Sequence, residues 1–303
     1  MNKLSGSASS TYTLAVLALL GSATMWGTIW YPLRLLEERG LAGVWCALIM
    51  YGVASLISLP WWRRHRCDFF AKPMMLFFLG LSSGWANIAF ILAVIDGEVV
   101  RVTLLFFLYP IWATLIGRFV LREQMSMKAW LGFTIAVSGA LVMMWNPELG
   151  DPLPKDANDW LALSAGMAFA VSAALVRSLD EISVIPKTIV VWLGVTLVAI
   201  IWLLIDHIPL PKLDGATYFY AILLGLFATV VMTLLVQYGF HHVPVSRSSV
   251  ILLFELVAGA VSAYWLANEM PSTSEWFGGV IIVIGAWLIL VSVNDSENEI
   301  EIS

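Results

Sequence analysis

The chain has 303 residues, of which 60% are hydrophobic and 12% are charged, and its formal net charge is −5 at pH 7. A soluble domain carries about twice this share of charged residues, so the composition indicates an integral membrane protein and excludes a sizeable soluble domain. The two cysteines and four histidines show no metal-ligand spacing. Since the sequence also has no phosphate loop, nucleophile elbow or metal-hydrolase motif, we expect no metal, no cofactor, no nucleic acid partner and no enzyme activity.

Apolar runs follow one another along the whole chain and are separated by short polar turns. A helix needs about 20 apolar residues to cross the hydrocarbon core of a bilayer. The runs predict an all-α membrane protein with ten transmembrane helices, at Tyr12–Leu33, Leu41–Trp61, Pro73–Val94, Val102–Phe119, Lys128–Trp145, Trp160–Val176, Lys187–Ile205, Thr217–Phe240, Ser248–Leu266 and Glu275–Val293.

The second half of the sequence repeats the first. At an offset of about 146 positions, charged, tryptophan and glycine residues coincide. The aligned pairs are Arg101 with Arg247, Glu123 with Glu269, Trp130 with Trp276, Gly132 with Gly278, and Gly139 with Gly285. The beginnings of the two halves align at an offset of about 143, which places Trp26 over Phe169 and Arg34 over Arg177. Chance does not easily supply matched charges and tryptophans at one offset, so the pattern indicates two copies of one unit.

Each predicted copy contains five spans, an odd number, so the second copy enters the membrane upside down relative to the first. We expect a first five-helix repeat at residues 1–147, an extracytoplasmic linker at 148–159 that is rich in Pro and Asp, and a second repeat at 160–303 that ends in a short acidic cytoplasmic tail. Inverted repeats of this kind form transporters with a site at the repeat interface.

Lysine and arginine are more frequent in the loops on one side of the predicted bundle. That side includes Arg63, Arg64, Arg66 and Lys72, and both termini. Cytoplasmic loops carry such an excess of positive charge. The pattern predicts a multi-pass membrane protein with both termini in the cytoplasm.

Glu255 is an acidic residue deep inside a predicted span, where a charge usually faces a cavity or a partner. At the repeat offset it corresponds to Tyr109, which precedes Pro110, and proline can kink the helix and expose backbone carbonyls. Glu255 is therefore a candidate for binding a substrate ammonium or a coupling proton. The alternative is a protonated carboxylic acid that is hydrogen-bonded to a neighbouring helix.

Aromatic and small polar residues complete the candidate substrate site. Aromatic walls suit flat apolar ligands and can hold an ammonium group by cation–π contact, although aromatic side chains also fill ordinary membrane cores. An amide or hydroxyl inside a span can bind a ligand or form an interhelical hydrogen bond. The candidate substrate-binding residues are Trp26, Trp85, Asn87, Phe107, Tyr109, Phe169, Thr233 and Glu255.

Several of these segments resemble the drug/metabolite transporter superfamily of EamA type. The segments are LYPIWATLIGRFVLREQ, its second copy LFELVAGAVSAYWLANEMP, and the pair Trp26-Gly27. The resemblance extends from Tyr12 to Val293. Within the superfamily, FFLYPIW at Phe106–Trp112 is similar to the fourth helix of bacterial aromatic amino acid exporters, with Phe107 and Tyr109 in place of Tyr and Trp. Phe169 falls where these exporters have a Trp on the sixth helix. This likeness implies a protein of the bacterial cytoplasmic (inner) membrane. The resemblance implies a basket of helices one, three, four, six, eight and nine around a central cavity.

We therefore expect a secondary transporter that exports amino acids, aromatic and other neutral ones, by alternating access around an aromatic cavity. A multidrug or cationic-metabolite efflux carrier is the alternative, with Glu255 as the partner of the cation. A nucleotide-sugar carrier would need Lys or Arg inside the spans, and a membrane enzyme or receptor would need a reactive cluster or a soluble domain. We expect contacts with membrane lipid and a monomer, and the sequence leaves an oligomer open.

Overall fold

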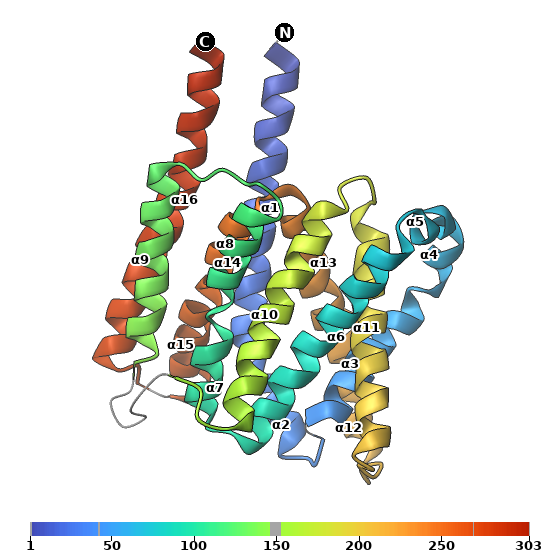
Figure 1. Cartoon of the computed structure of the whole chain (residues 1–303). Coiled ribbons are helices and arrows are strands. Elements are labelled where there is room, and N and C mark those ends of the chain that lie inside the picture. The colour runs from blue at the N-terminus through green and yellow to red at the C-terminus, as the bar shows by residue number, and fades with distance from the viewer. Residues whose placement is uncertain (1, 42, 146–152, 269, 303) are drawn as a thin grey trace.

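A computed structural model describes residues 2–41, 43–145, 153–268 and 270–302, and this part of the chain is helical with connecting turns (Figure 1). Both termini lie at the same end of the bundle. The helices are α1 (Asn2–Thr28), α2 (Trp30–Glu37), α3 (Gly43–Ile57), α4 (Leu59–Arg64), α5 (Arg66–Ala71), α6 (Pro73–Asp96), α7 (Val99–Phe106), α8 (Tyr109–Phe119), α9 (Met127–Met143), α10 (Ala157–Ser178), α11 (Val184–Ile205), α12 (Gly215–Leu223), the π-helix η2 (Leu224–Thr229), α13 (Val230–His242), α14 (Val245–Leu252), α15 (Phe254–Ala267) and α16 (Thr273–Ile302).

Eight helical stretches in the described part of the chain are long and apolar enough to cross a membrane. Two further apolar helices, Gly43–Ile57 and Met127–Met143, are shorter, so the ten predicted spans are not all confirmed. The predicted second span extended to Trp61, but α3 ends at Ile57. The difference arises because Pro60 has no N–H and cannot donate a hydrogen bond to the preceding turn, so α3 does not continue through it. Pro60 instead lies in the first turn of α4, where helices tolerate proline.

Two membrane helices are interrupted at equivalent points of the two halves. α7 ends at Phe106 and α8 begins at Tyr109, while α14 ends at Leu252 and α15 begins at Phe254. Pro110 in the first turn of α8 has no N–H to donate to the preceding turn. The second interruption has no proline, but Leu253 N donates to Val250 O instead of continuing the α-helical ladder. Both breaks place helix ends inside the bundle, where backbone groups need other partners.

Helices of each half pack against helices of the other half. α9 lies beside α16 and α3 beside α11, while α1 packs against α13 and α15, and α10 packs against α6 and α8. Figure 1 shows that α9 and α16 run in opposite directions. The first span of each half thus contacts the later spans of the other half, so the two halves form one bundle.

Glycines allow this close approach at the contact of α9 with α16. A Cβ atom at Gly132 would lie 2.7 Å from the Gly285 carbonyl oxygen, and one at Gly139 would lie 2.9 Å from the Gly278 carbonyl oxygen. Both distances are too short for a side chain. Small residues therefore form the interface between these two helices, as is common where helices associate in lipid.

Candidate functional site

An aromatic cluster surrounds the break between α7 and α8. The ring of Tyr109 lies 5.0 Å from that of Phe169 on α10, and 5.9 Å from that of Phe107. Phe169 also contacts Phe240 of α13, with 5.8 Å between ring centroids. The structure thus brings together three predicted site residues, Phe107, Tyr109 and Phe169. Phe240 was not predicted, because a phenylalanine in an apolar run carries no signal that separates it from ordinary core.

Tyr109 also joins the two interrupted helices. Its side chain is buried, and its hydroxyl donates a 3.0 Å hydrogen bond to the carbonyl oxygen of Ser249 on α14. Because Leu253 N donates to Val250 O, the carbonyl of Ser249 is open to this side-chain donor. The hydrogen bond therefore connects the fourth predicted span of one half to the equivalent span of the other.

Glu255 lies in the first turn of α15, directly after the second break, and its side chain is partly buried. Within the described residues, no hydrogen bond or ion pair engages its carboxylate. α1 passes close to its backbone, since a Cβ atom at Gly27 would lie 2.5 Å from the Glu255 carbonyl oxygen. A carboxylate at a helix N-terminus is stabilised by the helix dipole, and one inside a span is a functional candidate.

Two predicted polar residues form hydrogen bonds between and within helices. Asn87 accepts a 2.9 Å hydrogen bond from the hydroxyl of Tyr51 and donates one of the same length to the Ser83 carbonyl. The hydroxyl of Thr233 accepts a 2.7 Å hydrogen bond from Trp192 Nε1 and donates to the backbone carbonyl of Thr229, the last residue of η2. In this structure their polar groups therefore serve helix packing, the alternative that the sequence left open.

The two predicted tryptophans do not join the ring contacts of the aromatic cluster. Trp85 donates a 3.1 Å hydrogen bond from Nε1 to the hydroxyl of Ser164 on α10. Trp26 packs against two buried hydrophobic clusters, one of which contains Val44 and the other Met50. Their part in substrate binding remains a prediction.

Several buried polar groups that were not among the predicted site residues have no hydrogen-bond partner among the described residues. They include Trp112 Nε1, Thr114 Oγ1 and Gln237 Oε1. Thr114 and Gln237 are only 3% exposed, and a buried polar group without a partner costs about 1–3 kcal/mol. Gln237 is on the same helix as Phe240, so its oxygen is a candidate acceptor for a donor group of a ligand or for water.

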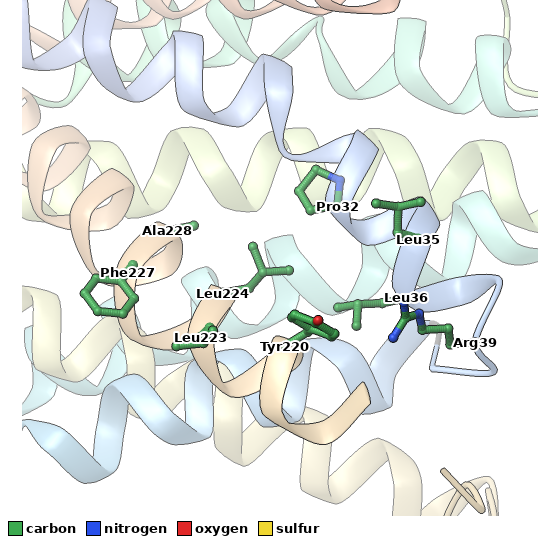
Figure 2. Close-up of a pocket in the computed structure, with 9 residues that line it drawn as sticks. All are labelled: Pro32, Leu35, Leu36, Arg39, Tyr220, Leu223, Leu224, Phe227 and Ala228. Atoms are coloured by element: carbon green, nitrogen blue, oxygen red, sulfur yellow. The ribbon is translucent and has the colours of Figure 1, made fainter. Parts of the chain in front are cut away.

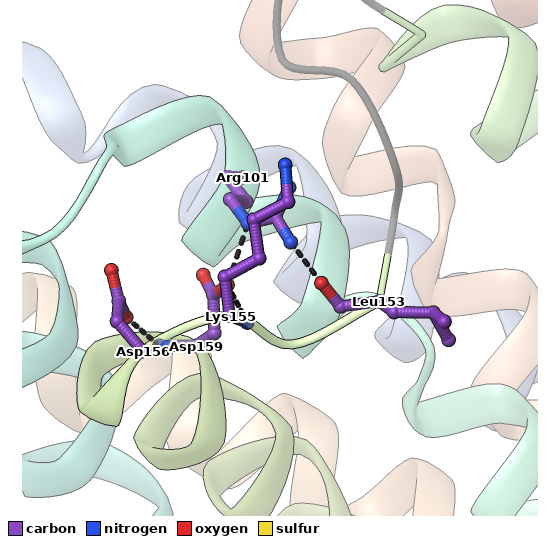
Figure 3. A network of polar contacts seen from close by, with 5 residues as sticks. All are labelled: Arg101, Leu153, Lys155, Asp156 and Asp159. Carbon is purple, nitrogen blue, oxygen red and sulfur yellow. Dashed lines mark hydrogen bonds and ion pairs between the residues drawn. The ribbon is translucent and has the colours of Figure 1, made fainter.

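A buried ion pair closes the bundle at the end opposite the termini (Figure 3). Arg101 Nε of α7 lies 2.6 Å from Asp159 Oδ2 of α10, and the two residues are 6% and 2% exposed. Arg101 also donates to the Leu153 carbonyl, and Lys155 N donates a 2.8 Å hydrogen bond to the same Asp159 oxygen. Sequence reasoning placed Arg101 in a loop, but the structure buries it because Asp159 supplies the opposite charge. The pair joins the helices that carry Phe107 and Phe169.

Polar contacts also link helices at the end that carries the termini. Glu123 accepts hydrogen bonds of 2.7 and 3.1 Å from the backbone N–H groups of Val245 and Ser246, at the N-terminus of α14. Lys187 is fully buried, and its Nζ lies 2.6 Å from His241 Nδ1. It also donates to two carbonyls at the end of α10, including the Leu179 carbonyl at 2.9 Å. Polar groups therefore link neighbouring spans on both sides of the aromatic cluster.

Comparison with known proteins adds three findings. The model of the EamA-like transporter family matches residues 13–145 and again residues 157–291. An uncharacterized transporter of Pseudomonas aeruginosa is 26% identical over 200 residues, which are 61% of this chain and 61% of that protein. A protein known from a crystal structure aligns with a TM-score of 0.72 at 15% identity, over 91% of this chain and 97% of its own, and this likeness concerns the fold alone.

Proposed function

Because the chain belongs to the EamA-like transporter family, which matches both of its halves, we propose that it exports aromatic and other neutral amino acids across the cytoplasmic membrane. Members of the family are transporters, and the described helices are those of a multi-pass membrane protein. Our proposal concerns two properties, namely the identity of the substrate and the direction of transport.

We further propose ten spans in two inverted five-helix repeats, at residues 1–147 and 160–303, with both termini in the cytoplasm. Three findings support this arrangement. The family model matches each half separately, the helix breaks lie at equivalent points of the two halves, and helices of each half pack against those of the other. The short helices α3 and α9 would then cross with the help of local bilayer thinning, which costs only fractions of a kcal/mol per Å of mismatch.

One observation carries the proposal. Glu255 follows the break between α14 and α15, and the aromatic cluster surrounds the equivalent break between α7 and α8. An amino acid has an ammonium group, a carboxylate and, in aromatic members, a flat apolar ring. The Glu255 carboxylate has no partner among the described side chains and suits the ammonium. The rings of Phe107 and Phe169 suit the side chain.

Transport would then proceed by alternating access. The Arg101–Asp159 pair closes one end, and the contacts of Glu123 with α14 close the other. Opening either end separates elements of the two halves, since Arg101 and Glu123 lie in the first half, while the helices that they contact, α10 and α14, form part of the second. Rocking of one half against the other around a fixed site is the expected motion.

Efflux of a cationic drug is the second candidate, because the Glu255 carboxylate suits any organic cation. The two candidates differ in the carboxylate of the substrate, which quaternary amines lack. Growth in the presence of quaternary amines, with and without expression of the protein, separates them. Resistance without amino acid transport would favour the drug carrier.

Reconstitution into liposomes tests the proposal. Liposomes containing the purified protein and loaded with labelled phenylalanine, tryptophan, methionine or threonine should release at least one of them faster than protein-free liposomes. If none of these amino acids moves, the proposed substrate class is wrong.

A further inference from the structure

A groove opens on the side of the bundle between α2 and the segment α12–η2 (Figure 2). Its volume is about 390 Å³, which lies within the usual range of small-molecule sites, about 300–1,000 Å³. Leu35 and Leu36 line it from α2, and Leu223, Leu224 and Phe227 line it from the other side. The groove is thus a long apolar trough with the dimensions of a ligand site.

Two helix irregularities shape the groove. α1 ends at Thr28 and α2 restarts at Trp30, so this span is not one straight rod. On the opposite wall, η2 is π-helical, a form that is rare and is frequent at functional sites. Gly225 in η2 packs against α3, where a Cβ atom would lie 2.7 Å from the Met50 carbonyl oxygen. η2 therefore approaches α3 closely through its glycine, and its bulky Phe227 lies at the groove.

One end of the groove is polar. Figure 2 shows Arg39 at this end and Phe227 at the other. The guanidinium carbon of Arg39 lies 5.2 Å from the centre of the Tyr220 ring. Arg39 lies two residues beyond the end of α2 and of the apolar stretch Ser10–Glu37, at the membrane end where lipid headgroups lie. A ligand that follows the groove thus meets apolar side chains first and a cation at its end.

Negative charges accompany Arg39. Hydrogen bonds from Thr217 hold the pKa of the Asp214 carboxyl below its ordinary value, and the charge of Arg39 acts in the same direction. Glu37 and Glu38 directly precede Arg39 in the chain. Since the end of the groove carries both signs of charge, it suits a headgroup with one phosphate and one ammonium better than a purely anionic one.

The apolar walls of the groove determine which chemical class the remaining part of the ligand belongs to. An amino acid or sugar in the trough would leave polar groups without hydrogen-bond partners, which is costly. Leu35 is 43% exposed and Phe227 is 63% exposed, so the trough opens sideways, toward the lipid in a membrane. We propose that the groove binds a membrane phospholipid with an ammonium-bearing zwitterionic headgroup, with one acyl chain on the leucines and the phosphate on Arg39.

Lipid titration of the purified chain, read by native mass spectrometry, tests this site. The probes are dioleoyl phosphatidylethanolamine, the matching phosphatidylcholine and phosphatidylglycerol, and dioleoylglycerol, which has no phosphate. Phosphatidylethanolamine should bind most tightly. Arg39→Gln should weaken its binding about tenfold, the loss expected for one charge-assisted hydrogen bond at an exposed site. Arg118→Gln, at the exposed end of α8 and outside the groove, should leave the binding unchanged and is the matched control.

Several results would overturn the proposal. Dioleoylglycerol or phosphatidylglycerol that binds as tightly as phosphatidylethanolamine would remove the assignment of the headgroup, and so would an Arg39→Gln protein that binds like the wild type. Ala228→Trp fills the groove beside Phe227 and should weaken all the lipids; unchanged binding would place the lipid elsewhere. A dimer that forms without lipid and is lost in Ala228→Trp would assign the groove to a second copy of the chain.

Discussion

The Arg101–Asp159 pair gives a stability prediction whose size follows from its burial. The side chains are 7% and 2% exposed and their charged atoms are 2.6 Å apart, so solvent screens them little. Asp159→Asn leaves the guanidinium buried without its counter-charge. Removing one partner of a buried pair typically costs about 3–5 kcal/mol, and we expect Asp159→Asn to fall in this range.

The assay is unfolding of the purified protein in detergent, followed by tryptophan fluorescence, for both single variants and for Arg101→Gln/Asp159→Asn. Because the double variant buries no uncompensated charge, it should be more stable than the sum of the single losses predicts, with a coupling of about 0.5–3 kcal/mol. Glu38→Gln is the control, since the exposed Arg34–Glu38 pair at 3.8 Å should contribute less than about 1 kcal/mol. Strictly additive losses, or an Asp159→Asn loss no larger than that of Glu38→Gln, would refute the reasoning.

Three further predictions concern the bundle. Tyr109→Phe removes the donor to the buried Ser249 carbonyl and should destabilise the protein by about 1–3 kcal/mol in the same unfolding assay; an unchanged midpoint would contradict this role. Gly139→Leu should lower the unfolding temperature through its contact with α16, while Gly52→Leu, where a Cβ atom meets nothing within 4 Å, should not; equal effects would be evidence against the glycine interface. A membrane-impermeant maleimide should label the exposed Cys67 only from the cytoplasmic side and Lys212→Cys only from the opposite side, and labelling of both from one side would refute the topology.

Local patterns predicted the features that depend on nearby residues. The lengths of the apolar runs predicted a helical membrane protein, and Pro110 pointed to the break between α7 and α8 because the missing N–H acts within one turn. The FFLYPIW segment identified the region that holds Phe107 and Tyr109. The repeat offset paired Tyr109 with Glu255, and both lie in the first turn after a helix break.

Features that depend on tertiary partners were not predictable. Arg101 reads as a loop residue by hydropathy, but its partner Asp159 is 58 residues away in the sequence. Asn87 and Thr233 occupy matched positions, yet the donors Tyr51 and Trp192 that engage them come from other helices. The length of α3 was overestimated, because the apolar composition continues past the break before Pro60.

The most direct test of the account is the initial rate of labelled phenylalanine efflux from liposomes that contain the wild-type protein or Glu255→Gln, with Glu38→Gln as the control. The account predicts efflux by the wild type and the control, and a rate at least about tenfold lower for Glu255→Gln, because the substrate ammonium loses its charged partner. Equal rates for wild type and Glu255→Gln would contradict the role of Glu255, and wild-type efflux no faster than that of protein-free liposomes would contradict phenylalanine export itself.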